Sequence, residues 1–323
     1  MILNDNSTSQ IDKFITSNNN LGTFISKLGL PLSIDKSILL SIIYSSHNHY
    51  RSFQIPKRKG GYRVIDSPYP TLKYIQGLIL NKYMADFSVD EYCFSFVKER
   101  NAIQHAKLHL NCHELLTLDI ESFFSSITYK MVFEALIDNK IRPIEAKYIS
   151  SICTLNGHLP QGACTSPVLS NIVFKSLDIR FTRLAKTLGL TYSRYADDLA
   201  FSGERVPRNI FKTIEKILQS KSFKLNKSKT KLKIEGARKI ITGVSISSGR
   251  AKAPKSYKRS LRAQIYELEK NKDNLVNMKN FDPSIYEKTL GKLNYLLQIE
   301  PENNYALLKK ETLLLDFKKF LMS

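Results

Sequence analysis

Three aspartates occupy positions from which their carboxylates could hold a divalent cation. Asp197 and Asp198 are adjacent in the tetrapeptide YADD, and Asp119 ends the apolar run ELLTLD far upstream. Neighbouring carboxylates repel each other, and an aspartate at the end of an apolar strand is costly to bury unless it is paired or metal-bound. Carboxylate oxygens suit Mg²⁺, and two such ions about 3.5 to 4 Å apart form the arrangement that catalyses phosphoryl transfer. The alternative for the adjacent pair is a solvated Asp-Asp turn without a ligand.

Strands must deliver these carboxylates to a common place. The segment LTYSRYADDLAFSG alternates around a short polar centre, which predicts a β-hairpin with Ala196, Asp197 and Asp198 at its tip. The apolar run that ends at Asp119 predicts a buried strand. A hairpin tip relaxes the strict alternation of side chains along a strand, so both adjacent aspartates can approach one site.

The remaining elements indicate an α+β fold. A basic Gly-Gly turn, KRKGG, joins two alternating runs and predicts a second hairpin that carries Lys57 and Arg63 near its tip. The basic residues of such a turn either bind phosphate or are solvated and keep the protein soluble. Helices are predicted around 129–155, over 167–188 and, with Pro breakers, over 255–323.

The charge of the chain points to a polyanionic partner. The 323 residues include 49 Lys+Arg and 29 Asp+Glu, a formal net charge of +20. A field of this size favours nucleic acid or an anionic membrane as partner, with a merely Lys-rich soluble surface as the alternative. Residues 221–262 hold 14 basic residues and one acidic residue, so most of the excess lies there.

Composition excludes several classes of protein. The chain is 42% hydrophobic, which excludes wholesale disorder, and no apolar run approaches the ~20 residues that a membrane span needs. The N-terminal residues MILNDNSTSQ lack the features of a secretory signal, and the four cysteines form no CxxC pair. We therefore expect a cytoplasmic protein with no membrane partner. His105, His109 and His113 are spaced by four, but no fourth ligand with suitable spacing favours zinc.

Three segments resemble, in order and spacing, the palm motifs of reverse transcriptases. They are LLTLDIESFFSSI at 115–127, LPQGACTSPVLSN at 159–171 and YSRYADDLAFSG at 192–203, the last containing the YxDD box. Two shorter segments resemble signatures of the retron reverse transcriptases. NAIQH at 101–105 is similar to their NAxxH motif, and ITG at 241–243 is similar to their VTG, with Ile in place of Val.

The resemblance implies a right-hand polymerase with fingers, a palm built on an antiparallel sheet, and a small helical thumb. The expected domains are an N-terminal arm or helix over 1–30, fingers and palm over 31–240, and a basic helical thumb that recognises RNA over 241–323.

The implied reaction is RNA-directed DNA synthesis. A retron enzyme would use a 2′-hydroxyl of its cognate structured noncoding RNA as primer, make a branched RNA–DNA product (msDNA) from dNTPs, and serve antiphage defence with an effector or toxin protein. Two alternatives are a group II intron-like or other solitary reverse transcriptase, and a scaffold that holds nucleic acid and restrains an effector. The three intact acids favour catalysis over the scaffold.

The resemblance also assigns roles at the catalytic and nucleotide sites. Asp119 and Asp197 would coordinate two Mg²⁺ ions, with Asp198 as the third acid and the Ile120 carbonyl as a backbone ligand. The residues that would bind the incoming nucleotide are Lys57 and Arg63 at the triphosphate, Phe124 under the sugar, and Gln161. Phe124 would exclude a 2′-hydroxyl, unless it is an ordinary core residue.

The resemblance further suggests where nucleic acid is held. Arg194 and Tyr195 would support the primer end, or are ordinary hairpin residues. The basic residues expected to grip the duplex or the RNA are Lys227, Lys229, Lys255, Lys258, Arg259 and Arg262. The retron signature comprises Asn101, Ala102, His105, Thr242 and Gly243, and the sequence does not indicate a physical role for it.

Overall fold

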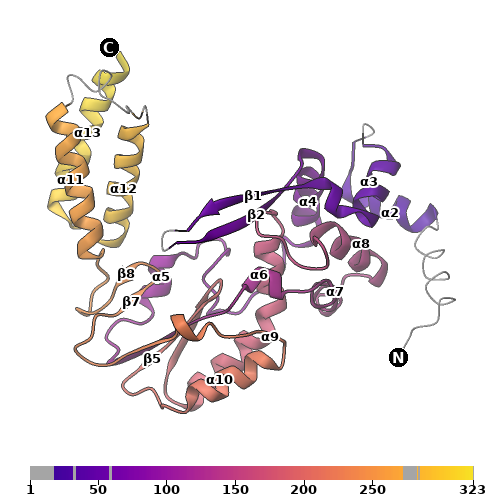
Figure 1. The fold of residues 1–323 in the computed structure, drawn as a ribbon, viewed down its shortest axis with the longest axis horizontal. Coiled ribbons are helices and arrows are strands. Elements are labelled where there is room, and N and C mark those ends of the chain that lie inside the picture. The colour runs from indigo at the N-terminus through magenta and orange to yellow at the C-terminus, as the bar shows by residue number, and fades with distance from the viewer. Residues whose placement is uncertain (1–17, 32–33, 58–59, 272–281, 283, 323) are drawn as a thin grey trace.

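A four-stranded antiparallel sheet, of which Figure 1 labels β5, lies between helices α9 (Ser166–Thr187) and α10 (Ile210–Gln219) and the short elements around β7 (Ile240–Ile241) and β8 (Val244–Ser245). The computed structural model describes residues 18–31, 34–57, 60–271, 282 and 284–322, so the first 17 residues of the expected N-terminal arm or helix at 1–30 lie outside the described residues. The strand order is β4-β5-β3-β6. The strands are β3 (Glu114–Asp119), β4 (Thr191–Tyr195), β5 (Asp198–Gly203) and β6 (Lys231–Lys233).

The two faces of the sheet belong to two separate clusters of buried residues. Leu116, Leu118 and Phe201 point into the larger cluster, where helix α9 (Ser166–Thr187) contributes Phe174 and Phe181. The alternate residues Leu115 and Ala200 point into a second cluster, shared with the C-terminal helices. The two central strands, β3 and β5, are therefore covered on both faces, which explains why apolar residues follow one another in them.

The hairpin of β1 (Tyr50–Pro56) and β2 (Tyr62–Pro68) is present as the sequence predicts. It reaches across the molecule from α3 and α4 towards the C-terminal helices (Figure 1). Two residues of the basic turn, 58 and 59, lie outside the described part of the chain. The elements on this side and beside the sheet are α2 (Asn18–Leu28), α3 (Lys36–Tyr44), η1 (Ser46–His49), α4 (Pro70–Tyr83), α6 (Phe123–Ser126), α7 (Tyr129–Asp138), α8 (Pro143–Cys153) and α10 (Ile210–Gln219).

Three helices stand together at the C-terminal end of the molecule (Figure 1). They are α11 (Lys255–Asn271), α12 (Ile285–Ile299) and α13 (Asn304–Met322). Leu261, Ile265 and Leu293 lie in their common core because α11 and α12 repeat apolar residues at helical spacing. The short elements between the sheet and this bundle are α5 (Ala102–Lys107), η2 (Lys227–Lys229), β7 (Ile240–Ile241) and β8 (Val244–Ser245).

The mixed arrangement of helices and antiparallel strands confirms the α+β prediction. Among the described residues, none of the helices combines the length and the apolar character required to cross a membrane.

Candidate active site

The three aspartates meet at one end of the central sheet. Asp119 and Asp198 are directly opposed in the β3–β5 register, so their side chains leave the same face of the sheet. Asp197 lies in the two-residue turn between β4 and β5, and its carbonyl accepts a hydrogen bond of 2.9 Å from the Ile120 amide. The structure thus brings together residues from two distant segments, as the sequence predicts.

Negative charge at this end of the sheet is only partly balanced. Lys229 donates to both carboxylate oxygens of Asp119, at 2.9 and 2.8 Å. Burial raises the pKa of Asp197, and the charge of Asp119 raises it further. The pKa of Asp198 is raised to about 7 by desolvation, then by Asp197 and Asp119, although part of its side chain is exposed.

These residues fit a divalent cation by their chemistry. Carboxylate oxygens from two strand ends, with the Ile120 backbone beside them, are the hard ligands that Mg²⁺ prefers. Burial and then the neighbouring carboxylates raise the pKa values of Asp197 and Asp198, and a bound cation would offset both effects. No group of three or more His, Cys, Asp or Glu side chains in the described residues already has the arrangement of a metal site. Lys229 donates to both oxygens of Asp119, so a cation bound to these oxygens would compete with it.

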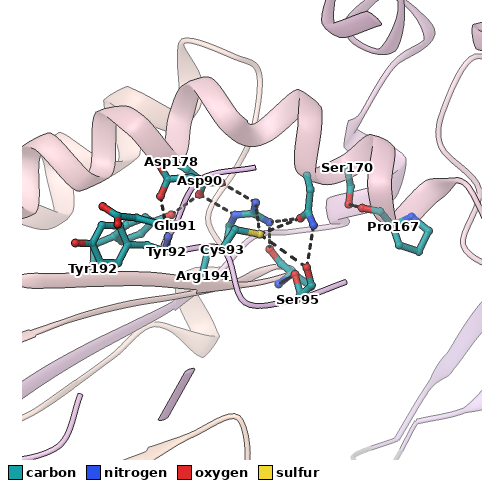
Figure 2. A network of polar contacts seen from close by, with 12 residues as sticks. Asp90, Glu91, Tyr92, Cys93, Ser95, Pro167, Ser170, Asp178, Tyr192 and Arg194 are labelled. Atoms are coloured by element: carbon teal, nitrogen blue, oxygen red, sulfur yellow. Dashed lines mark hydrogen bonds and ion pairs between the residues drawn. The ribbon is translucent and has the colours of Figure 1, made fainter. Parts of the chain in front are cut away.

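A buried polar network fixes the turn that carries Asp197 (Figure 2). Ala196 has a left-handed φ of 55°, its amide donates to Ser95 Oγ at 2.7 Å, and its carbonyl accepts from Arg194 Nη1 at 3.2 Å. Arg194 in turn binds both carboxylate oxygens of Asp178 on α9, at 2.8 and 2.7 Å. Because both polar groups of Ala196 are held, the backbone that leads into Asp197 is fixed from behind.

Arg194 is therefore not a nucleic-acid contact, and that prediction is wrong. Its side chain is 0% exposed, and Figure 2 shows it enclosed between Asp178 and Cys93. It also donates to Asn171 Oδ1 at 3.1 Å and lies over the Phe174 ring at 4.6 Å. Its neighbour Tyr195 is half-buried on the same strand and remains available at the site.

The loop that holds Gln161 is joined to the edge of the β1–β2 hairpin. The Gln161 carbonyl accepts a hydrogen bond of 2.9 Å from the Asp66 amide. Gly162 follows with a φ of 143°, and a Cβ there would lie 2.6 Å from the Asp66 carbonyl oxygen. Only glycine permits so close an approach, which explains the Gln-Gly pair in this loop.

Two residues expected at the triphosphate lie at the other end of the same hairpin. Lys57 and Arg63 are both exposed near its tip. The positive charge of Arg63 lowers the pKa of Asp197 against the larger effects that raise it, so the guanidinium lies within electrostatic reach of the aspartate turn.

Phe124 lies five residues beyond Asp119 and is half-buried in the short helix α6. Its ring packs at 5.5 Å from the ring of Phe123, which is buried, and at 6.3 Å from that of Phe96, which is exposed. One edge of Phe124 is thus anchored in the core while the rest remains accessible.

A cavity of about 550 Å³ adjoins Asp119 and Asp198. Its other charged lining residues are all basic: Lys229, Lys231, Lys233 and Arg238. Lys231, Lys233 and Arg238 belong to the basic stretch 221–262, but their sequence does not predict that they lie at the site. Their signal was the alternation of lysines along a short strand, which puts Lys231 and Lys233 on one face of β6.

The basic residues expected to grip nucleic acid divide into exposed and internally paired groups. Lys255, Arg259 and Arg262 are exposed and, with the 63%-exposed Tyr266, follow one face of α11 at helical spacing. Lys258 is instead turned to Glu300 at 3.0 Å and is only 25% exposed, so it ties α11 to the end of α12. The expectation that Lys258 faces nucleic acid is not met in this structure.

The other two basic residues of the prediction lie near the sheet. Lys227 is 72% exposed and 3.3 Å from Glu215, and Lys229 binds Asp119. The residues of the retron signature, from two segments far apart in sequence, contact each other: the Thr242 hydroxyl donates to the Ala102 carbonyl at 3.0 Å.

Comparison with known proteins identifies the family. Residues 55–264 match the model of the family described as reverse transcriptase (RNA-dependent DNA polymerase). The match covers more than half of the chain, and the chain therefore belongs to the reverse transcriptase family. The match also confirms the predicted right-hand polymerase fold.

Three curated relatives of the chain are retron reverse transcriptases. The chain is 30% identical over 280 residues to the Retron Mx162 reverse transcriptase of Myxococcus xanthus, covering 76% of this chain and 58% of that protein. It is 29% identical over 288 residues to the Retron Mx65 reverse transcriptase of the same organism, covering 81% and 64%. It is 26% identical over 305 residues to the Retron Ec86 reverse transcriptase of Escherichia coli, covering 89% and 92%.

The chain thus spans less than two thirds of the length of the two myxobacterial relatives. The sequence-based assignment to a retron-type reverse transcriptase is confirmed by these matches.

Proposed function

We propose that this protein is an RNA-directed DNA polymerase in which Asp119, Asp197 and Asp198 carry the chemistry. The observation that carries the proposal is the meeting of three carboxylates from two strand ends, with the pKa values of Asp197 and Asp198 raised first by burial and then by carboxylate neighbours that lack a balancing positive charge. Two Mg²⁺ ions held by these acids and the Ile120 carbonyl would supply that charge, activate the primer hydroxyl and neutralise the leaving pyrophosphate.

The chain's own residues would hold the reactants on either side of the acids. Lys57 and Arg63 on the hairpin would bind the triphosphate, and a guanidinium suits phosphate because it donates in a planar fork. Gln161 would contact the nucleotide, since its loop is joined to the same hairpin. Phe124 would lie under the sugar and exclude a 2′-hydroxyl, so that DNA rather than RNA is made.

Two basic surfaces would hold the nucleic acid. The cavity beside Asp119 and Asp198 would receive the phosphates of one strand near the primer end. The exposed face of α11, with Lys255, Arg259, Arg262 and Tyr266, would grip the RNA or the RNA–DNA duplex. Tyrosine among cations suits an unpaired base, because a ring can stack while the cations bind phosphate.

The first experiment measures primer extension on an RNA template of defined sequence with dNTPs and Mg²⁺. We expect DNA complementary to the template, and no synthesis by the double variant Asp197→Asn/Asp198→Asn, whose RNA binding is retained. Polymerisation by the double variant would refute the site. Incorporation of ribonucleotides by Phe124→Ala, but not by the unchanged protein, would support the role of Phe124.

The names of the relatives lead us to propose the biological substrate. We propose that the protein copies part of a cognate structured noncoding RNA from a 2′-hydroxyl primer, leaving branched RNA–DNA (msDNA), and acts in the cytoplasm in antiphage defence with an effector protein. Sequencing the nucleic acid that copurifies with the protein tests this proposal, and a 2′,5′-branched species is the expected result. Linear nucleic acid alone would favour another solitary reverse transcriptase.

A further inference from the structure

The two segments of the retron signature, residues 101–105 and 241–243, contact each other between the central sheet and the start of the C-terminal helical bundle. Asn101 caps α5, its Oδ1 accepting from the amides of Ile103 and Gln104 at 2.9 and 3.0 Å. The carbonyl of Ala102 accepts from the hydroxyl of Thr242 at 3.0 Å, and the same hydroxyl lies 3.4 Å from His105 Nδ1. These signature residues therefore hold the start of α5 against the turn that contains Thr242.

Thr242 is held in a conformation that its side chain disfavours. Thr242 and Gly243 form the two-residue turn between β7 and β8, with φ values of 44° and 83°. Positive φ at both positions is the geometry of a tight two-residue hairpin turn, which favours Asn or Gly at these positions. A β-branched residue there is strained. Backbone strain of this kind persists where surrounding interactions hold the residue in place. The interaction seen here is the hydrogen bond from the Thr242 hydroxyl to the Ala102 carbonyl on α5.

His105 connects this contact to the β4–β5 hairpin, because its ring packs near that of Tyr195 on β4. Its side chain is 1% exposed, and its ring lies 5.8 Å from that of Tyr195 and 5.6 Å from that of Phe94. Burial lowers its pKa to about 3, so the ring is neutral. Its Nε2 has no hydrogen-bond partner among the described residues, so it is the ring and Nδ1 that hold it in place.

His109, one turn further on, binds both strands of the same hairpin. Its Nε2 lies 2.6 Å from Ser193 Oγ on β4, and its Nδ1 lies 2.6 Å from Ser202 Oγ on β5. The segment of His105 and His109 is thus bound to the hairpin that carries Asp197. At its other side it contacts Thr242, from which the chain leads into α11.

We propose that Thr242 and His105 are positioning residues, which fix the ring of Tyr195 beside the aspartate turn and so align the primer end with the bundle that grips the duplex. The inference rests on the proposed function, in which Tyr195 supports the primer. Tyr195 also lies close enough to Tyr295 on α12 to raise the pKa of that residue, after the larger effect of burial. The ring therefore stands between the sheet and the bundle.

The test is a pre-steady-state burst of DNA synthesis on an RNA template, where the burst amplitude counts active sites and the burst rate reports alignment. Thr242→Val removes the hydroxyl with little change of shape, and we expect a burst rate about fivefold lower at unchanged amplitude, the loss expected for one hydrogen bond. Thr242→Ser should restore the rate of the unchanged protein.

Thr187→Val is the matched control, because the Thr187 hydroxyl also donates to a helix carbonyl at 3.0 Å, that of Arg183 at the end of α9. We expect its burst to equal that of the unchanged protein. His105→Phe keeps the ring and loses Nδ1, so it should also slow the burst, and Thr242→Val should slow that variant no further.

An unchanged rate in Thr242→Val, or a loss of amplitude alone, would overturn the inference, since the latter is what a merely structural role produces. Additive slowing in the double variant would also overturn it. Absence of any DNA synthesis by the unchanged protein would instead refute the proposed function, so the two failures are distinguishable.

Discussion

The β4–β5 hairpin and helix α11 both present arginines, but the two regions use them in opposite ways. Arg194 on β4 is 0% exposed and binds Asp178, Asn171 and the Ala196 carbonyl. Arg259 on α11 is exposed and has no ion-pair partner among the described residues. One arginine fixes a backbone turn, and the other is free to meet a polyanion.

The difference follows from what each region must do. A carboxylate that takes part in chemistry must be placed within a fraction of an ångström, and a buried network with locked side chains achieves this. A grip on a nucleic-acid backbone must follow a long and repetitive charge pattern, and exposed mobile cations suffice because phosphate contacts carry no sequence information. We infer that the hairpin supplies rate and the helix supplies affinity.

The largest effect is expected when a substitution breaks the buried network around Arg194. Arg194→Met leaves Asp178 as an uncompensated buried carboxylate, so the free energy of unfolding should fall by about 3 to 5 kcal/mol in urea denaturation. The matched change Arg259→Met should alter the free energy of unfolding by no more than ~0.5 kcal/mol, as is usual for surface positions. Equal effects of the two substitutions would remove the contrast between the regions.

The next effect tests the exposed face of α11. Replacing Lys255, Arg259 and Arg262 together by Gln should lower RNA affinity about a hundredfold near 0.1 M salt and reduce the slope of log affinity against log salt by about 2 to 3. The extension rate at saturating RNA should not change. A control that replaces the exposed Lys140, Lys186 and Lys212 by Gln should leave the slope unchanged. A salt response that is flat in the unchanged protein would contradict the account.

The smallest effect concerns Lys229, which combines features of the two regions. Its side chain is 60% exposed, like the basic residues of α11, yet it binds a buried aspartate, Asp119, as Arg194 binds Asp178. Solvent screens the exposed ammonium of Lys229, which limits the strength of the ion pair to roughly 1 kcal/mol, so Lys229→Gln should raise the affinity of the free protein for Mn²⁺ by a few-fold. The measurement is a Mn²⁺ titration followed by electron paramagnetic resonance, without nucleic acid. Weaker Mn²⁺ binding would show that Lys229 helps to hold the cation rather than competing with it.

The sequence predicts those parts of the site that local pattern determines. Asp119, Asp197 and Asp198 could be found because an apolar strand and a hairpin each end in carboxylate, and the β1–β2 hairpin because alternating runs flank a Gly-Gly turn. The fold class followed from the same patterns and from the resemblance to a family.

Other parts depend on contacts between distant segments and could not be read locally. An arginine in a motif looks the same in the sequence whether it faces solvent or, like Arg194 on β4, pairs with Asp178 on a distant helix. Ser95, which holds the Ala196 amide from 101 positions away, has no local signal at all. The contact of Thr242 with α5 spans 140 positions in the sequence. Burial and long-range pairing decide these roles, and neither is a property of a short pattern.

The most direct test compares Asp197→Asn with the triple α11 variant in the same assay, measuring the single-turnover rate of extension and the dissociation constant for RNA. Removing a group that stabilises the transition state should lower the rate of Asp197→Asn at least about a hundredfold with RNA affinity unchanged. The triple variant should show the reverse, weak binding with a normal rate at saturation. A normal rate in Asp197→Asn, or a parallel loss of RNA binding in that variant, would contradict the assignment of chemistry to the aspartate turn.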